Sequence, residues 1–194
     1  MEEFWFYCEL GLDHVLDFSA YDHILFLSAL TIPFTFRNWK KVLILATVFT
    51  IAHCLSLALS VYEILIFDVR LIEFLIPITI IITALFNLYY AKRQVEEKSI
   101  LWPILATIFF GLIHGFGFSN YFKMLMAEEE EKLTALFGFA TGIELSQIAI
   151  ILSVLVFAYV SQSLLTVKQH IFILATSILI ICITIPILIN TFPF

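Results

Sequence analysis

Histidine and carboxylate side chains interrupt hydrophobic sequence at several separate places in this chain. Asp22 and His23 stand in SAYDHILFL, His53 stands in FTIAHCLSL, and His114 stands in FGLIHGFGF. An ionisable group in lipid costs on the order of 3 kcal/mol, so several of them in one chain are expected to face a common interior site. Imidazole and carboxylate groups together are typical ligands of divalent transition metals. The pattern therefore predicts an intramembrane metal site.

Glu144 is a further carboxylate inside hydrophobic sequence, in GIELSQ. Gln147 follows it by three residues, so the two side chains share a helical face. A glutamate with a glutamine partner in a membrane suits metal ligation, proton transfer or general-base chemistry, and an interhelical hydrogen bond is the structural alternative. Thr50 shares a face with His53 in the same way and is expected to support that histidine.

The three histidine segments also have structural interpretations without a ligand. Asp22 can cap the helix that it begins, and it can equally be a co-ligand or orient the neighbouring imidazole. His53 can form a hydrogen bond with an adjacent helix. His114 precedes Gly115 and Gly117, which let a helix approach its neighbour closely or break at a cavity.

Membrane helices must position these side chains. Of the 194 residues, 62% are hydrophobic and 13% are charged, whereas a soluble domain has about 45–50% apolar and about 25% charged residues. A span needs about 20 apolar residues, and six segments qualify, of which the first is short: 22–36, 42–61, 71–91, 101–119, 133–160 and 170–190. The sequence predicts an all-α polytopic membrane bundle of about six transmembrane helices. We expect this bundle to be a single transmembrane domain over 1–194, preceded within it by a short interfacial helix in 1–20.

Basic residues set the orientation of this bundle. Those that follow the first, third and fifth spans are Arg37, Lys40, Lys41, Lys92, Arg93, Lys98 and Lys168, and those at the other ends are Arg70, Lys123 and Lys132. The positive-inside rule places the first set in the cytoplasm and both termini outside. His23, His53, His114 and Glu144 then fall between the bilayer centre and the outer surface. We expect a site that faces the outside of a bacterial inner (cytoplasmic) membrane.

Five stretches in order carry a resemblance to a known family. They are YDHILFL (21–27), FTIAHCLSL (49–57), IEFLIPITI (72–80), FGLIHGFGFS (110–119) and FGFATGIELSQ (137–147). The chain resembles the HupE/UreJ membrane proteins, which are regarded as nickel or cobalt permeases. The resemblance implies matching positions at His14, Asp22, His23, His53, Glu73, His114, Glu144 and Gln147. The expected metal ligands are His14, Asp22, His23, His53, His114 and Glu144, supported by Gln147, Glu73 and Thr50.

Two functions stay open for such a site. The resemblance favours a permease for a divalent metal such as Ni²⁺, Co²⁺ or Zn²⁺. The alternative is an intramembrane zinc-dependent hydrolase of a lipid or a membrane-anchored peptide, with Asp22 or Glu144 in a catalytic role. The expected partners are the lipid bilayer and the metal ion. The sequence leaves open whether the protein forms a homo-oligomer. The basic residues are few and scattered, so no nucleic-acid partner is predicted.

Overall fold

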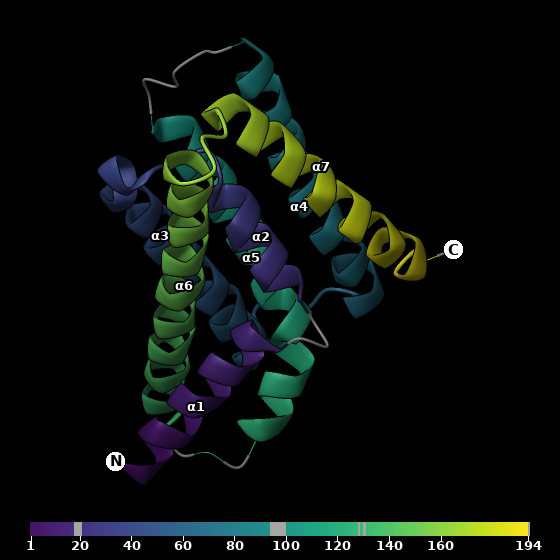
Figure 1. The fold of residues 1–194 in the computed structure, drawn as a ribbon. Coiled ribbons are helices and arrows are strands. Elements are labelled where there is room, and N and C mark those ends of the chain that lie inside the picture. The colour runs from purple at the N-terminus through teal and green to yellow at the C-terminus, as the bar shows by residue number, and fades with distance from the viewer. Residues whose placement is uncertain (18–20, 94–99, 128, 130, 194) are drawn as a thin grey trace.

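A computed structural model of the chain describes residues 1–17, 21–93, 100–127, 129 and 131–193, and every regular element within these ranges is helical (Figure 1). The elements are α1 (Glu2–Leu16), α2 (Asp22–Thr31), the 3₁₀ turn η1 (Phe36–Asn38), α3 (Trp39–Val61), α4 (Val69–Arg93), α5 (Leu101–Leu125), α6 (Lys132–Ser163) and α7 (Gln169–Asn190). The predicted all-α class is therefore confirmed.

Five helices, α3 to α7, are long and apolar enough to cross a membrane. A helix satisfies its own backbone hydrogen bonds, which is what a hydrocarbon environment requires. The predicted first span, 22–36, differs from these five. It forms α2, which has 10 residues and thus a length of about 15 Å, half of the roughly 30 Å hydrocarbon core. Pro33 follows closely and cannot continue the helical hydrogen bonding.

Contacts between loops define two ends of the bundle. At one end, Gln169 at the start of α7 donates a hydrogen bond of 3.2 Å to the Pro33 carbonyl between α2 and η1. At the other end, Lys123 of α5 forms a 2.6 Å ion pair with Glu63, which follows α3, and this partner lowers the pKa of the Glu63 carboxyl. The loops on the predicted cytoplasmic and outer sides therefore gather at opposite ends. Which end faces the cytoplasm stays a prediction from the basic residues.

Helix α1 packs across the first half of α6, at the end that carries Glu63 (Figure 1). A Cβ on Gly142 would collide with the Cys8 carbonyl, so the absence of a side chain lets the two backbones touch. The Tyr7 hydroxyl donates a 2.9 Å hydrogen bond to Glu129 in the loop before α6. Burial, assisted by this carboxylate, raises the pKa of Tyr7. The predicted N-terminal helix is thus a packed part of the bundle.

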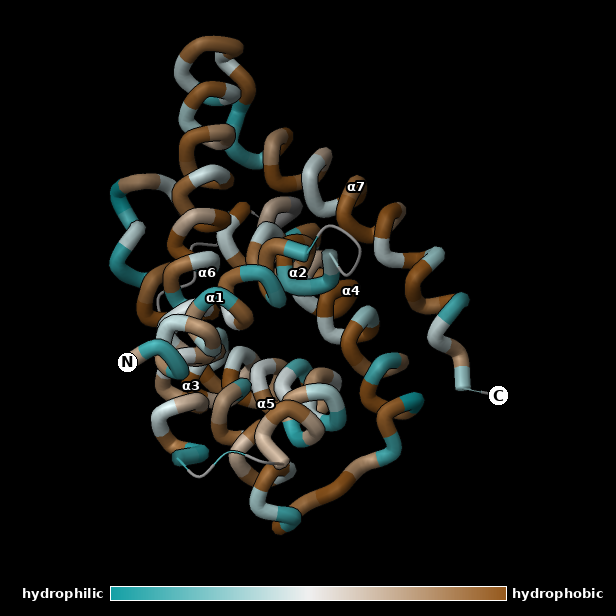
Figure 2. The backbone as a smooth tube through the Cα atoms, turned by 90° about the horizontal axis from the view of Figure 1, so that it is seen from below, coloured by the Kyte–Doolittle hydropathy of each residue, from teal (hydrophilic) through white to brown (hydrophobic). Residues whose placement is uncertain are grey.

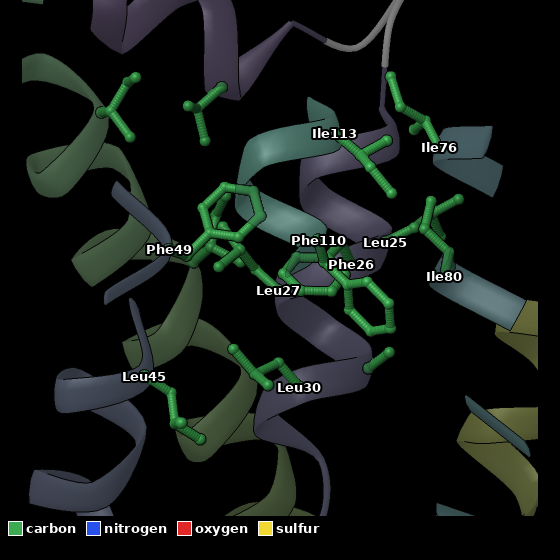
Figure 3. Packing of buried hydrophobic residues seen from close by; sticks show 14 of the residues in the cluster. Leu25, Phe26, Leu27, Leu30, Leu45, Phe49, Ile76, Ile80, Phe110 and Ile113 are labelled. Atoms are coloured by element: carbon green, nitrogen blue, oxygen red, sulfur yellow. The ribbon is translucent and has the colours of Figure 1, made fainter. Parts of the chain in front are cut away.

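Large hydrophobic side chains lie both inside the bundle and on its outer surface. Phe26, Phe49 and Leu45 are completely buried in the centre (Figure 3). Ile51, by contrast, is 63% exposed although it lies in the middle of α3. Figure 2 shows hydrophobic segments running along the outlying helices α4 and α7 as well. Apolar surface of this kind is what a lipid bilayer covers.

Candidate metal centre

Four helices each bring one histidine to a single cluster near the end of the bundle covered by α1. His14 is in the last turn of α1, His23 is in the first turn of α2, His53 is in α3 and His114 is in α5. Ring centroids lie 4.7 Å apart for His14 and His23, 5.8 Å for His14 and His53, 5.5 Å for His23 and His53, and 5.3 Å for His23 and His114. His23 therefore occupies the centre of the cluster.

Asp22 orients the central imidazole. Its Oδ1 accepts a hydrogen bond of 2.9 Å from the His23 backbone N–H, and it lies 3.2 Å from His23 Nδ1. An ionised carboxylate only accepts hydrogen bonds, so Nδ1 carries the proton. The other nitrogen, Nε2, is buried and has no hydrogen-bond partner among the described residues. Nε2 of His23 is thus the atom that offers a lone pair to the cluster.

A threonine on α4 orients His114 in a similar way. Thr79 Oγ1 donates a 2.7 Å hydrogen bond to the Ile76 carbonyl and lies 3.0 Å from His114 Nε2. The hydroxyl has one proton, and that proton is already committed to the carbonyl. His114 Nε2 must therefore donate, which leaves Nδ1 of His114 unprotonated. Nδ1 is buried, and none of the described residues forms a hydrogen bond with it, as expected of a ligand atom.

Several imidazole nitrogens in the cluster are buried, and no described residue forms a hydrogen bond with them. They are His14 Nε2, His23 Nε2, both ring nitrogens of His53, and His114 Nδ1. Native proteins pair most of their buried polar atoms, so a group of unpaired ones indicates a missing partner. Two sets of three side chains have ligand atoms within 4.8 Å of one another: His14, His23 and His53, and Asp22, His23 and His114. The cluster has the donor set of a transition-metal site.

Aromatic rings enclose the cluster. Phe118 lies against His14 with a centroid distance of 3.9 Å, and Phe26 lies 5.1 Å from His114. Phe49 lies 5.8 Å from His53. Burial, followed by the neighbouring His23, lowers the pKa of His14 to about 3. His14 is accordingly neutral near pH 7, which is the form that can bind a metal.

Close packing of α3 on α5 sets the separation of His53 and His114. A Cβ on Gly115, next to His114, would collide with the His53 carbonyl and with Ser56 Oγ. The sequence offered close approach or a helix break as the role of this glycine, and α5 is unbroken from Leu101 to Leu125. Gly115 therefore permits close approach, and it brings the two histidine-bearing backbones into contact.

Glu144 lies in α6 beside α3. Its carboxylate accepts hydrogen bonds from two threonines and not from the histidines. Its Oε1 accepts a 2.6 Å hydrogen bond from Thr47, and its Oε2 accepts a 2.7 Å hydrogen bond from Thr50. The groups of clustered ligand atoms within the described residues do not include it. Gln147, one turn along α6, is fully buried, and neither the oxygen nor the nitrogen of its amide has a hydrogen-bond partner in the described part of the chain. Thr50 thus supports Glu144, and not an imidazole, through the hydrogen bond observed.

Two other ionisable side chains, Glu73 and His170, lie away from the cluster. Glu73 is exposed near the start of α4, and the structure does not bring it to the imidazoles. His170 is in the first turn of α7, at the opposite end of the bundle from α1. Glu73, which the family resemblance implied in a supporting role, therefore lies apart from the imidazoles.

Comparison with known families identifies the chain. The family described as HupE / UreJ protein matches residues 1–190. The chain belongs to the HupE/UreJ family. The comparisons with curated proteins and with solved structures found no match. HupE/UreJ proteins are membrane proteins related to nickel and cobalt transport, and the described part of this HupE/UreJ chain has histidine and aspartate groups placed closely enough to hold a metal ion.

Thr79 is one of two residues at the site of this HupE/UreJ chain that the sequence did not reveal. It lies within IEFLIPITI, a stretch that carries the family resemblance, but a threonine in an apolar helix gives no signal of its own. Phe118 was also missed, because phenylalanine is abundant and faces lipid at many other positions. Their roles follow only from which helices pack together.

Proposed function

We propose that this HupE/UreJ chain binds a divalent transition-metal ion with His14, His23, His53 and His114 and carries it across the membrane. The unpaired imidazole nitrogens carry this proposal. Each would cost free energy in a buried site without a partner, and one ion bound between the rings would satisfy several of them together. Asp22 contributes negative charge and holds His23 in the required tautomer.

Nickel, cobalt and zinc suit this donor set. Neutral imidazole is a good ligand for Ni²⁺, Co²⁺ and Zn²⁺, whereas Mg²⁺ and Ca²⁺ prefer sites made of oxygen atoms. The family relation adds weight to nickel and cobalt. In the bacterial inner membrane, with the positive-inside orientation, the cluster would take its ion from the outside.

Transport has more support than the alternative, an intramembrane zinc hydrolase. A hydrolase needs a base beside a metal-bound water. Both carboxylates that the sequence offered for that role have other hydrogen-bond partners: Asp22 binds the His23 backbone and faces its ring, and Glu144 binds Thr47 and Thr50. The family is related to metal transport across membranes, which also favours transport over hydrolysis.

Two measurements on purified protein test the proposal. Equilibrium dialysis with Ni²⁺, Co²⁺ and Zn²⁺ measures binding, and proteoliposomes measure uptake of the same ions. We expect His23→Ala, His53→Ala and His114→Ala each to lower affinity by about 100-fold or more, because each removes a ligand and not only an outer partner. His170→Ala is the matched control and should bind like the parent protein. Unchanged binding in all three cluster variants would reject the metal site.

Removal of the metal by a chelator distinguishes a transported ion from a tightly bound catalytic cofactor. A transported ion must leave, so we expect EDTA to remove the bound metal rapidly and fresh Ni²⁺ or Co²⁺ to restore it. A single zinc ion that resists EDTA, in protein that catalyses no uptake, would instead favour the hydrolase.

A further inference from the structure

A layer of buried apolar side chains lies between the imidazole cluster and the opposite end of the bundle, and it blocks a direct path for an ion. Phe26 and Phe49 have stacked rings with centroids 4.9 Å apart, and both are fully buried. Leu27 and Leu45 are fully buried in the same core (Figure 3). A dehydrated divalent ion cannot cross such a layer without a large electrostatic penalty. An ion that leaves the cluster needs a polar way around it.

Polar atoms lead away from the cluster between α3 and α6. His53, Thr50 and Thr47 follow one another at three-residue intervals along α3, so each step advances about 4.5 Å along the helix. Both threonine hydroxyls reach the same carboxylate, Glu144, at 2.6 Å and 2.7 Å. The ring of Phe139, just over one turn before Glu144 on α6, lies 6.4 Å from His53. Glu144 is therefore the next carboxylate beyond the imidazoles in this direction.

Gln147 extends the same polar series. It follows Glu144 by one helical turn, on the side away from Phe139. Its exposed fraction is 0%, and among the residues that the structure describes neither its amide oxygen nor its amide nitrogen has a hydrogen-bond partner. Leaving a buried amide unpaired costs about 1–3 kcal/mol. An unpaired polar side chain beside a carboxylate in a membrane is a position where a cation can be stabilised.

We infer that Glu144, with the hydroxyl oxygens of Thr47 and Thr50 and the amide oxygen of Gln147, forms a second cation position that receives the metal ion from the imidazole cluster. The inference rests on the proposed transport function and deepens it. Oxygen ligands hold Ni²⁺ and Co²⁺ less tightly than imidazole does. A weaker position after a tight one permits release, which conduction through successive sites requires.

The critical variant is Glu144→Gln, which removes the negative charge and keeps the size of the side chain. In equilibrium dialysis with Ni²⁺, the parent protein should bind one ion tightly and a second weakly. The variant should keep the tight ion and lose the weak one. Uptake into proteoliposomes should fall about tenfold or more, in line with the loss of one charged group at a metal site. Glu9→Gln removes the same charge from an exposed position on α1 and should change neither measurement.

A second variant keeps the inference testable if Glu144→Gln folds poorly. Thr47→Val with Thr50→Val preserves side-chain shape and the carboxylate but removes both hydroxyl oxygens. We expect it also to keep the tight ion and to lower uptake. Normal uptake in folded Glu144→Gln would overturn the inference, and so would loss of the tight ion, since Glu144 would then belong to the imidazole site. If the parent protein neither binds nor transports metal, it is the proposed function itself that fails.

Discussion

For two of the four histidines, a hydrogen bond on the far side of the ring decides which nitrogen the residue presents to the cluster. Asp22 fixes the Nδ1 proton of His23, and Thr79 fixes the Nε2 proton of His114. The two histidines consequently offer different atoms, Nε2 and Nδ1, toward a shared space. The identity of a ligand residue is readable in the sequence, but the ligand atom depends on a partner from another part of the chain.

Thr79→Val tests the tautomer of His114. Valine keeps the shape of the threonine and removes the hydroxyl that accepts from His114 Nε2. We expect metal affinity to fall by about 10–100-fold, the usual effect of losing an outer partner of a histidine ligand. The measurement is Ni²⁺ binding by equilibrium dialysis. Thr176→Val is the control, because that hydroxyl bonds only to its own helix in α7 and should leave affinity unchanged.

Asp22→Asn tests the role of the charge beside His23. The amide can still occupy the position of Oδ1, but it no longer neutralises a bound cation or favours the required tautomer. We predict weaker Ni²⁺ binding, by about 10–100-fold, in a protein whose helical content by circular dichroism is unchanged. Parent-like affinity would mean that Asp22 acts only at the start of its helix.

At the scale of helices, close backbone contact determines where the ligands stand. Gly115 brings α5 against α3, and Gly142 brings α6 against α1. These pairs share the largest contacts in the bundle, and three of the four helices involved carry a histidine of the cluster. The sequence shows glycine next to His114, but it does not show which helix that glycine faces.

Gly115→Ala and Gly117→Ala form a matched pair at this scale. A Cβ at Gly115 meets the His53 carbonyl, which is backbone and cannot give way cheaply. We expect a loss of about 1–3 kcal/mol of stability from overpacking, together with weaker metal binding. A Cβ at Gly117 meets mainly the flexible end of Ile76, so its effect should be much smaller. Thermal unfolding in detergent and Ni²⁺ binding distinguish the two, and equal effects would contradict the contact described.

The whole molecule has two distinct ends, and the predicted orientation assigns one to each side of the membrane. Ile66 lies after α3 at the end near Glu63 and is 68% exposed, and Leu165 lies between α6 and α7 at the other end and is 66% exposed. In a background without the native cysteines, Ile66→Cys should react with an impermeant maleimide added to intact cells. Leu165→Cys should react only after permeabilisation, because the positive-inside rule places it in the cytoplasm. The reverse labelling pattern would show that the protein has the opposite orientation in the membrane.

The sequence alone determined the helical membrane class, the family resemblance and the residue types at the site. Long apolar segments can cross lipid only as helices or closed barrels, and their roughly 20-residue lengths indicate helices, so the hydropathy pattern suffices for the class. It also pointed to His23, His53 and His114, since ionisable groups are costly in such segments, and the family resemblance added His14.

Only the tertiary structure decided how these groups divide between two places. Helical periodicity shows which residues share a face, but it does not show which face meets which neighbour. The packing of α1 on α6 and of α3 on α5 gathers the four imidazoles around His23, while the contact of α3 with α6 pairs Glu144 with Thr47 and Thr50. The short α2 likewise depends on its neighbours, because a helix of about 15 Å cannot cross the bilayer alone. Long-range packing, which the local sequence does not encode, separates the imidazole cluster from the neighbouring carboxylate.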